Sequence, residues 1–144
     1  MIRDENNLLL AMNLFKRAFF AILGVLVIHG ALIVTGGYRI NQIDVPMHLM
    51  GGFAMGLLGL AIHHAVASKY HTTHFPAWYH YLFVVGFAML IGIAWEFHEY
   101  IMDHTINTWY NLPFSQPSLA DTMKDFLMDW IGASVAFTLF KKHL

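Results

Sequence analysis

The chain has 144 residues, of which 58% are hydrophobic and 12% are charged, whereas soluble domains carry about 25% charged residues. This composition predicts a polytopic membrane protein with a single domain over residues 1–144. The net charge of −1, without a basic cluster, argues against nucleic-acid binding, and the absence of cysteine excludes disulfides, thiolate metal sites and cysteine nucleophiles.

The N-terminal quarter predicts two elements. Residues 4–16 mix charges with leucines, as an interfacial helix does, and a first span follows over residues 18–36. Lys16 and Arg17 stand where the basic region of a secretory signal would stand. Because the apolar segment is long and no clear cleavage site follows it, we expect an uncleaved span.

A second span is predicted over residues 45–67. Asp44 and His48, at its start, are four residues apart and therefore share a helix face with Gly52. Gly52 and Gly56 form a small-xxx-small pair, which lets a neighbouring helix approach closely. The pair is also our candidate contact for a homo-oligomer.

The connection after this span is rich in histidine. His71 and His74 lie in the connection itself, and His63 and His64 lie just before it. No fixed ligand frame and no carboxylate accompany them, so solvated histidines at the membrane surface are favoured over a metal site.

The third predicted span covers residues 81–102 and is apolar until Trp95. An acidic face then follows with the spacing of one side of a helix, and it consists of Glu96, Glu99 and Asp103. Residues 104–119 contain two prolines and several polar residues, which predicts a loop with aromatic anchors at the membrane surface.

The fourth predicted span, over residues 119–140, carries acids inside an apolar run. Ser118 and Asp121 fit an S-x-x-D capping box, which starts the helix. Asp121, Asp125 and Asp129 recur every four residues and descend one helix face. An ionised Asp near the centre of a bilayer costs about 2.5–3.5 kcal/mol, so such groups are expected to face a partner, a cavity or a pathway.

The distribution of lysine and arginine predicts the topology. Only Arg39 and Lys124 fall on one side of the spans, and the other basic residues share the opposite side: Arg3, Lys16, Arg17, Lys69, Lys141 and Lys142. The positive-inside rule therefore puts both termini in the cytoplasm. The acidic ends of the second, third and fourth spans then meet at the outer face of the membrane, which we expect to be a bacterial inner (plasma) membrane.

Together these predictions give an all-α fold, a four-helix transmembrane bundle in which carboxylates from three spans converge. They outnumber the nearby cations, so either some carboxylates are protonated or a cation lies among them. Oxygen-rich ligands with one imidazole suit a divalent Mg²⁺, Mn²⁺ or Zn²⁺ ion, and so many carboxylates allow two ions. The predicted metal ligands are Asp44, His48, Glu96, Asp121 and Asp125.

Three motifs also resemble a known family: DVPMHLMGG at 44–52, WEFHE at 95–99 and DTMKDFLMDWIGA at 121–133. They are similar to the YjdF-type family of bacterial inner-membrane proteins of unknown function and, more weakly, to the VanZ-like proteins associated with glycopeptide resistance. The resemblance brings no established activity. It implies that the family motifs include Asp44, His48, Glu96, Glu99, Asp121, Thr122 and Asp125.

Three functions stay open, and with them the question of whether the protein is an enzyme. The first is a metal-dependent hydrolase or transferase that acts on a lipid-linked or phosphorylated headgroup, with Glu99 or Asp129 as general base. The second is a proton- or cation-coupled transporter that uses the acids as a relay. The third is a polar cluster that serves assembly alone. Since no acid continues beyond Asp129 toward the cytoplasm, a one-sided site is favoured over a through path.

Overall fold

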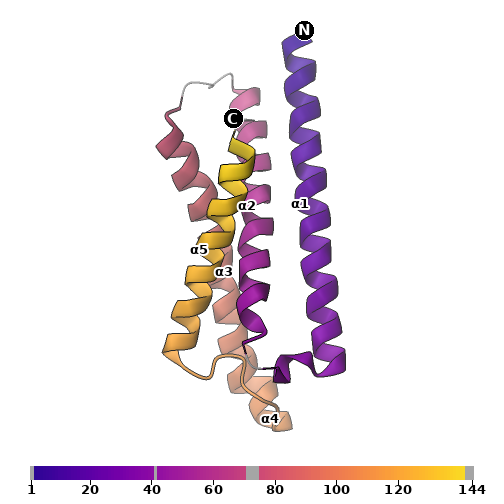
Figure 1. Ribbon diagram of the computed structural model, residues 1–144, viewed down its shortest axis with the longest axis vertical. Coiled ribbons are helices and arrows are strands. Elements are labelled where there is room, and N and C mark those ends of the chain that lie inside the picture. The colour runs from indigo at the N-terminus through magenta and orange to yellow at the C-terminus, as the bar shows by residue number, and fades with distance from the viewer. Residues whose placement is uncertain (1, 41, 71–74, 142–144) are drawn as a thin grey trace.

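In the computed structural model, which describes residues 2–40, 42–70 and 75–141 and the side chains from Leu8 onward, the chain is all-α (Figure 1). The long helices of the described chain are α1 (Ile2–Thr35), α2 (Asp44–Lys69), α3 (Ala77–Met102) and α5 (Leu119–Phe140). The predicted all-α class is therefore confirmed. Helix α1 begins and α5 ends at the same end of the bundle (Figure 1).

Helix α1 differs from the predicted arrangement at its start. Residues 4–16 do not form a separate interfacial helix but continue into the first span as one helix of 34 residues. The sequence has no glycine or proline between Ile2 and Leu23 to interrupt it. Ala11, Leu14 and Ala18 recur on one face and are buried, so this part of α1 packs against the bundle.

Three helices of the described chain are long and apolar enough to cross a membrane, over Leu8–Thr35, Asp44–Lys69 and Ala77–Tyr110. Helix α5 lies alongside them and carries its acids toward α2, since Asp125 and Asp129 are buried. Its outward face is apolar and exposed at Leu127, Trp130 and Leu139. The surface that α5 presents therefore suits lipid, although the charges lower its average hydropathy.

The segment after α3 is more helical than the sequence predicts. Helix α3 passes into a π-helical turn, Asp103–Asn107, and then into the short helix α4, Thr108–Tyr110. The predicted loop therefore begins only at Asn111, whose positive φ of 54° ends the helix. At the same end of the bundle, the short 3-10 helix η1, Gly37–Arg39, connects α1 to α2.

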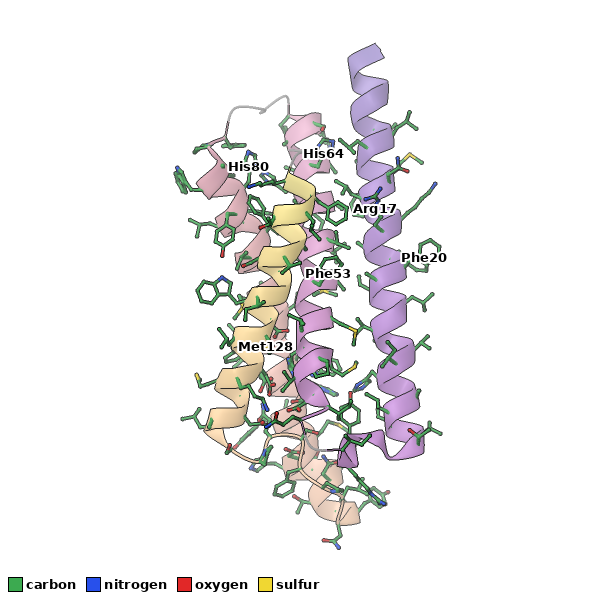
Figure 2. All side chains as sticks on the ribbon, in the orientation of Figure 1. Arg17, Phe20, Phe53, His64, His80 and Met128 are labelled. Atoms are coloured by element: carbon green, nitrogen blue, oxygen red, sulfur yellow. The ribbon has the colours of Figure 1, made fainter. Side chains whose placement is uncertain are left out.

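Helix α2 is the centre of the bundle, since it packs against α1, α3 and α5. Leu57, Leu60, Val84 and Phe137 form the apolar core in its middle. On the outside, Phe20 of α1 points away from the other helices (Figure 2). Apolar side chains thus lie both inside the bundle and on its surface, as in a protein surrounded by lipid.

The predicted close approach of a helix at Gly52 and Gly56 is confirmed, and the neighbour is α5 of the same chain. A Cβ atom on Gly52 would lie 2.2 Å from the Asp129 carbonyl oxygen, and one on Gly56 would lie 2.9 Å from the Ala136 Cβ. Helix α5 of the same chain therefore already packs against both glycines. A homo-oligomer would therefore have to use another surface.

The histidines near the C-terminal end of α2 are less exposed to solvent than the sequence predicts. His63 and His64 are buried, and His63 Nε2 lies 2.6 Å from His80 Nδ1. His80 Nε2 in turn lies 3.0 Å from the Phe75 carbonyl oxygen. His71 and His74 lie outside the described residues.

Candidate functional site

A polar cluster lies at the end of the bundle away from the start of α1, and His48 of α2 is its centre. His48 Nδ1 lies 3.4 Å from Asp129 Oδ2. His48 Nε2 lies 3.7 Å from Glu96 Oε1 and 4.0 Å from Asp125 Oδ2. These four side chains are at most 7% exposed, and they come from α2, α3 and α5. The convergence predicted from the topology is confirmed for them.

Small residues at the helix contacts bring these side chains together. A Cβ on Gly132 would lie 2.2 Å from the Leu49 carbonyl oxygen, and one on Gly92 would lie 2.4 Å from Asp129 Oδ2. Helices α2 and α5 therefore touch through their backbones beside His48. Larger residues at these positions would force Asp125 and Asp129 away from the imidazole.

Two buried carboxylate oxygens in the cluster have no hydrogen-bond partner in the described part of the chain: Glu96 Oε1 and Asp125 Oδ1. An unpartnered buried oxygen is costly, especially on a group that ionises. One donor atom each from His48, Glu96 and Asp125 lies within 4.8 Å of the others. Two donors that bind one ion at about 2.1 Å lie at most about 4.2 Å apart, and the His48 distances of 3.7 and 4.0 Å meet this limit. The three residues could therefore hold a divalent ion.

The other oxygen of Glu96 is held by a residue that sequence reasoning missed. Gln116, in the loop before α5, donates its side-chain amide to Glu96 Oε2 and also to the Glu96 carbonyl oxygen. Thr122, which the resemblance placed in the family motifs, also interacts with the Glu96 carboxylate. Gln116 lies in a loop, and no helical spacing links it to the acids. Its contact with Glu96 could therefore not be predicted from the sequence pattern.

A second acidic group adjoins the first and is less buried. Asp44, Asp121 and Asp125 each offer an oxygen within 4.8 Å of the others. Lys124 occupies this group, with Nζ 2.6 Å from Asp121 Oδ1 and 3.3 Å from Asp44 Oδ2. The predicted set of five ligands thus divides into two groups that share Asp125, and one of them already contains a cation.

Asp103 lies outside both groups, although the helical spacing predicted a common face with Glu96 and Glu99. Its carboxylate accepts from the backbone N–H groups of Ser115 and Gln116, each at 2.8 Å, and from the Asn107 side chain at 2.6 Å. Asp103 is buried by these contacts. It fixes the loop that carries Gln116 and so positions Glu96 indirectly.

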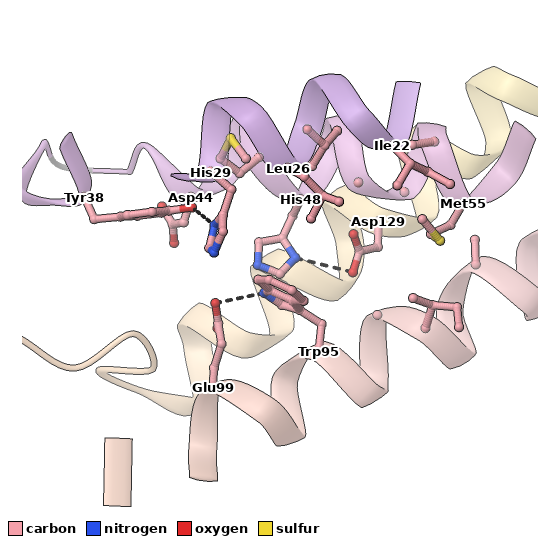
Figure 3. A pocket seen from close by; sticks show the side chains of 18 residues that line it. Ile22, Leu26, His29, Tyr38, Asp44, His48, Met55, Trp95, Glu99 and Asp129 are labelled. Atoms are coloured by element: carbon pink, nitrogen blue, oxygen red, sulfur yellow. Dashed lines mark hydrogen bonds and ion pairs between the residues drawn. The ribbon is translucent and has the colours of Figure 1, made fainter. Parts of the chain in front are cut away.

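A cavity of about 140 Å³ lies next to the cluster, between α1, α2 and α3. Figure 3 shows His48, Glu99 and Asp129 facing it, with apolar side chains such as Ile22 and Met55 further along. Glu99 accepts a hydrogen bond of 2.9 Å from Trp95 Nε1. One end of the cavity is therefore polar and the rest is apolar.

Tyr38 and His29 close the polar end of this cavity on the side of α1. The Tyr38 hydroxyl lies 2.5 Å from His29 Nδ1, and the His29 ring packs edge-on against Trp95. Burial, together with the carboxylates of Glu99 and Asp44, raises the pKa of Tyr38 to about 12. The phenol keeps its proton at neutral pH and can donate it. Neither residue shares a helical spacing with the acids, so no sequence pattern linked Tyr38 or His29 to the cluster.

Comparison with known proteins assigns a family. Residues 7–144 match the model of a family described as predicted membrane protein (DUF2238). The chain belongs to the DUF2238 family. The match covers every residue of the polar cluster, and with the three apolar helices it identifies an integral membrane protein. It does not test the YjdF-type and VanZ-like resemblances, which stay predictions. No curated protein and no solved structure matches the chain significantly.

Proposed function

We propose that this DUF2238 protein holds one divalent metal ion on His48, Glu96 and Asp125, and that it is a metal-dependent hydrolase or transferase of a lipid-linked or phosphorylated headgroup. The observation that carries the proposal is the unpartnered, buried Glu96 Oε1, which lies 3.7 Å from His48 Nε2. Asp125 adds Oδ2 at 4.0 Å from the same nitrogen, and its Oδ1 is buried without a partner in the described part of the chain. Two carboxylates and an imidazole suit Mg²⁺, Mn²⁺ or Zn²⁺.

Asp129 supports this assignment by orienting the imidazole. An ionised Asp129 can only accept a hydrogen bond, so His48 Nδ1 carries the proton and Nε2 presents its lone pair to Glu96 and Asp125. A carboxylate behind a ligating histidine is the usual arrangement in metal sites. We therefore assign Asp129 to positioning His48 and not to proton transfer.

Glu99 is then the candidate general base. It lines the cavity, and Trp95 fixes one of its oxygens while the carboxylate remains part-exposed. A divalent ion at this site would polarise a phosphoryl or carbonyl oxygen and acidify a bound water. Glu99 is placed to accept a proton from a group that enters the cavity.

The transporter alternative lacks a continuation of the polar path. Next to Asp129, in the middle of the bundle, the described interior is apolar, with Ala133, Ala136 and Phe137 on α5, and the buried histidines His63 and His64 lie only beyond it. Leu57 and Leu60 of α2 face these apolar residues of α5. A cation at His48 would have to cross this core, which favours a one-sided site.

Metal analysis tests the proposal. Purified protein, stripped with a chelator and re-equilibrated with Mn²⁺ or Zn²⁺, should retain about one ion per chain. Glu96→Gln and Asp125→Asn should each lower the affinity by about 10-fold or more, since both remove a charged ligand. The matched control, Glu99→Gln, should keep the ion because Glu99 is not a ligand.

The other functions give different outcomes. Metal-free wild-type protein that takes cations into vesicles would favour transport. If neither ion nor flux is found, and the wild type shows no thermal stabilisation by any of these metals, the cluster serves assembly. The stabilisation measurement needs no variant, so it is decisive even if Glu96→Gln fails to fold.

A further inference from the structure

The cavity beside His48 is incompletely closed between α1 and α3. Its apolar part is lined by Val25 and Leu26 of α1, Met55 of α2 and Ala88 and Ile91 of α3. Helix α1 packs against α2, whereas direct contact between α1 and α3 is slight in the described chain. The cavity thus occupies the space that a closer packing of α1 on α3 would fill.

Two of the lining residues locate the mouth of the cavity. Leu26 of α1 is 54% exposed and Ile91 of α3 is 38% exposed, although both line the cavity. Both also lie within helices long and apolar enough to cross a membrane. A rim on these residues opens toward the hydrocarbon of the bilayer and not toward water.

The polar end of the cavity is closed by contacts between the same two helices. His29 of α1 packs edge-on against Trp95 of α3, with ring centroids 5.2 Å apart, and also contacts Tyr38. A ligand that enters between Leu26 and Ile91 therefore meets apolar side chains first and the carboxylate and imidazole groups last. This order matches the order of chain and headgroup in a lipid.

The size of the cavity limits how much of a ligand it holds. Its volume of about 140 Å³ is close to that of an engineered apolar cavity of about 150 Å³ that binds benzene. It therefore accommodates roughly six carbon atoms, the part of one chain next to the headgroup. The remainder of the chain would stay in the bilayer.

We propose that this cavity binds the headgroup-proximal segment of a membrane lipid chain, which enters laterally between α1 and α3 and brings the headgroup to His48 and Glu99. The inference rests on the proposed function for the role of the headgroup. Binding of the chain is independent of the metal and can be measured separately.

Trp95, which lines the cavity, reports on binding. A protein in which Trp78, Trp109 and Trp130 are replaced by Phe keeps Trp95 as its sole tryptophan. Titration in detergent micelles with phosphatidylglycerol brominated near the headgroup end of one chain should quench Trp95 fluorescence with saturation. A bromine atom quenches only on close approach, so saturation reports a site.

Two matched substitutions on α1 decide the outcome. Val25 lines the cavity, whereas Val27 is 62% exposed and does not line it. Val25→Phe should fill the cavity and weaken the apparent affinity about 10-fold or more, a difference of about 1.4 kcal/mol. Val27→Phe should leave the titration unchanged. Both variants keep the packed core of α2, α3 and α5.

Non-saturating quenching, or equal quenching in the Val25→Phe and Val27→Phe proteins, would overturn lipid binding in the cavity. Asp125→Asn separates this inference from the proposed function. If Asp125→Asn loses the metal but keeps saturable quenching, both proposals stand. If the wild type holds no metal but quenching is saturable and sensitive to Val25→Phe, only the metal proposal fails.

Discussion

At the scale of single residues, the two ring nitrogens of His48 have different surroundings. Nδ1 faces Asp129 at hydrogen-bond range, whereas Nε2 faces Glu96 and Asp125 at distances too long for a good hydrogen bond. Such separations are expected where an ion lies between the groups. They are not expected where the same groups satisfy one another, so the assembly-only alternative leaves the two bare oxygens unexplained.

Lys124 decides how many ions the cluster holds. Its ammonium group lies between Asp44 and Asp121, where the second acidic group would otherwise hold a cation. We predict that Lys124→Met, which removes the charge and keeps the length, raises the Mn²⁺ stoichiometry from one ion per chain to two. Isothermal titration with the chelator-stripped protein measures this.

Lys124→Arg is the control, because it keeps the positive charge and should retain one ion per chain. A Lys124→Met protein that still binds a single ion with unchanged affinity would contradict this role. Loss of the part-exposed ion pairs should itself cost only about 1 kcal/mol or less of stability, so the protein is expected to remain folded for the titration.

Helical periodicity predicted most of the residues in the cluster but not their division into two groups. Asp121, Asp125 and Asp129 share a face because α5 is regular, and the structure bears this out. Asp103 departs from the pattern because the loop folds back and supplies backbone donors to it. Gln116 belongs to that loop, and loop conformation has no period that a sequence could display.

At the scale of helices, the contact between α2 and α5 depends on glycine. The backbone of α5 passes so close to Gly52, and that of α2 so close to Gly132, that no side chain fits at either position. The acids of α5 lie within an otherwise apolar run, which predicts that their charges face the inside of the bundle. This pattern does not reveal which helix receives them, and the pair Gly52 and Gly56 predicted only that some helix approaches closely; the structure identifies that helix as α5.

We predict that Gly52→Ala and Gly132→Ala each destabilise the protein by about 1–3 kcal/mol, because each Cβ would meet backbone that cannot move alone. The melting temperature in detergent measures this, and metal retention should fall in parallel. Gly86→Ala is the control. Nothing lies within 4 Å of a Cβ there, and alanine should stabilise α3 by up to about 1 kcal/mol.

Equal melting temperatures for the three glycine variants would contradict the close packing of α2 on α5. A selective loss of metal in Gly52→Ala, without loss of thermal stability, would instead show that the contact acts mainly by placing Asp125 and Asp129. In either case Gly86→Ala reports what the substitution itself does to a helix of this protein.

At the scale of the whole molecule, the cluster lies at one end and the start of α1 and the end of α5 lie at the other (Figure 1). The four long helices and their order could be predicted from hydropathy and from turn residues, because a bilayer admits few alternatives for so short a chain. The continuous helix from Ile2 and the helical turns after Met102 could not. The cavity could not, since it depends on how closely α1 approaches α3.

The orientation of the bundle is predicted by its basic residues and can be measured directly. The chain has no cysteine, so a single introduced thiol is an unambiguous label. We expect Ser115→Cys, in the loop next to the cluster, to react with a membrane-impermeant maleimide in bacterial spheroplasts. Tyr70→Cys, at the exposed end of α2 on the opposite side, should react only after the membrane is permeabilised.

The reverse labelling pattern would place the cluster at the cytoplasmic face. The His48 site would be unchanged in that case, but its metal and its lipid headgroup would come from the inner leaflet and the cytoplasm. The orientation therefore determines which side of the membrane supplies the substrate. Six of the eight basic residues share the side of the termini, and that excess favours an outward-facing site with a lipid of the outer leaflet.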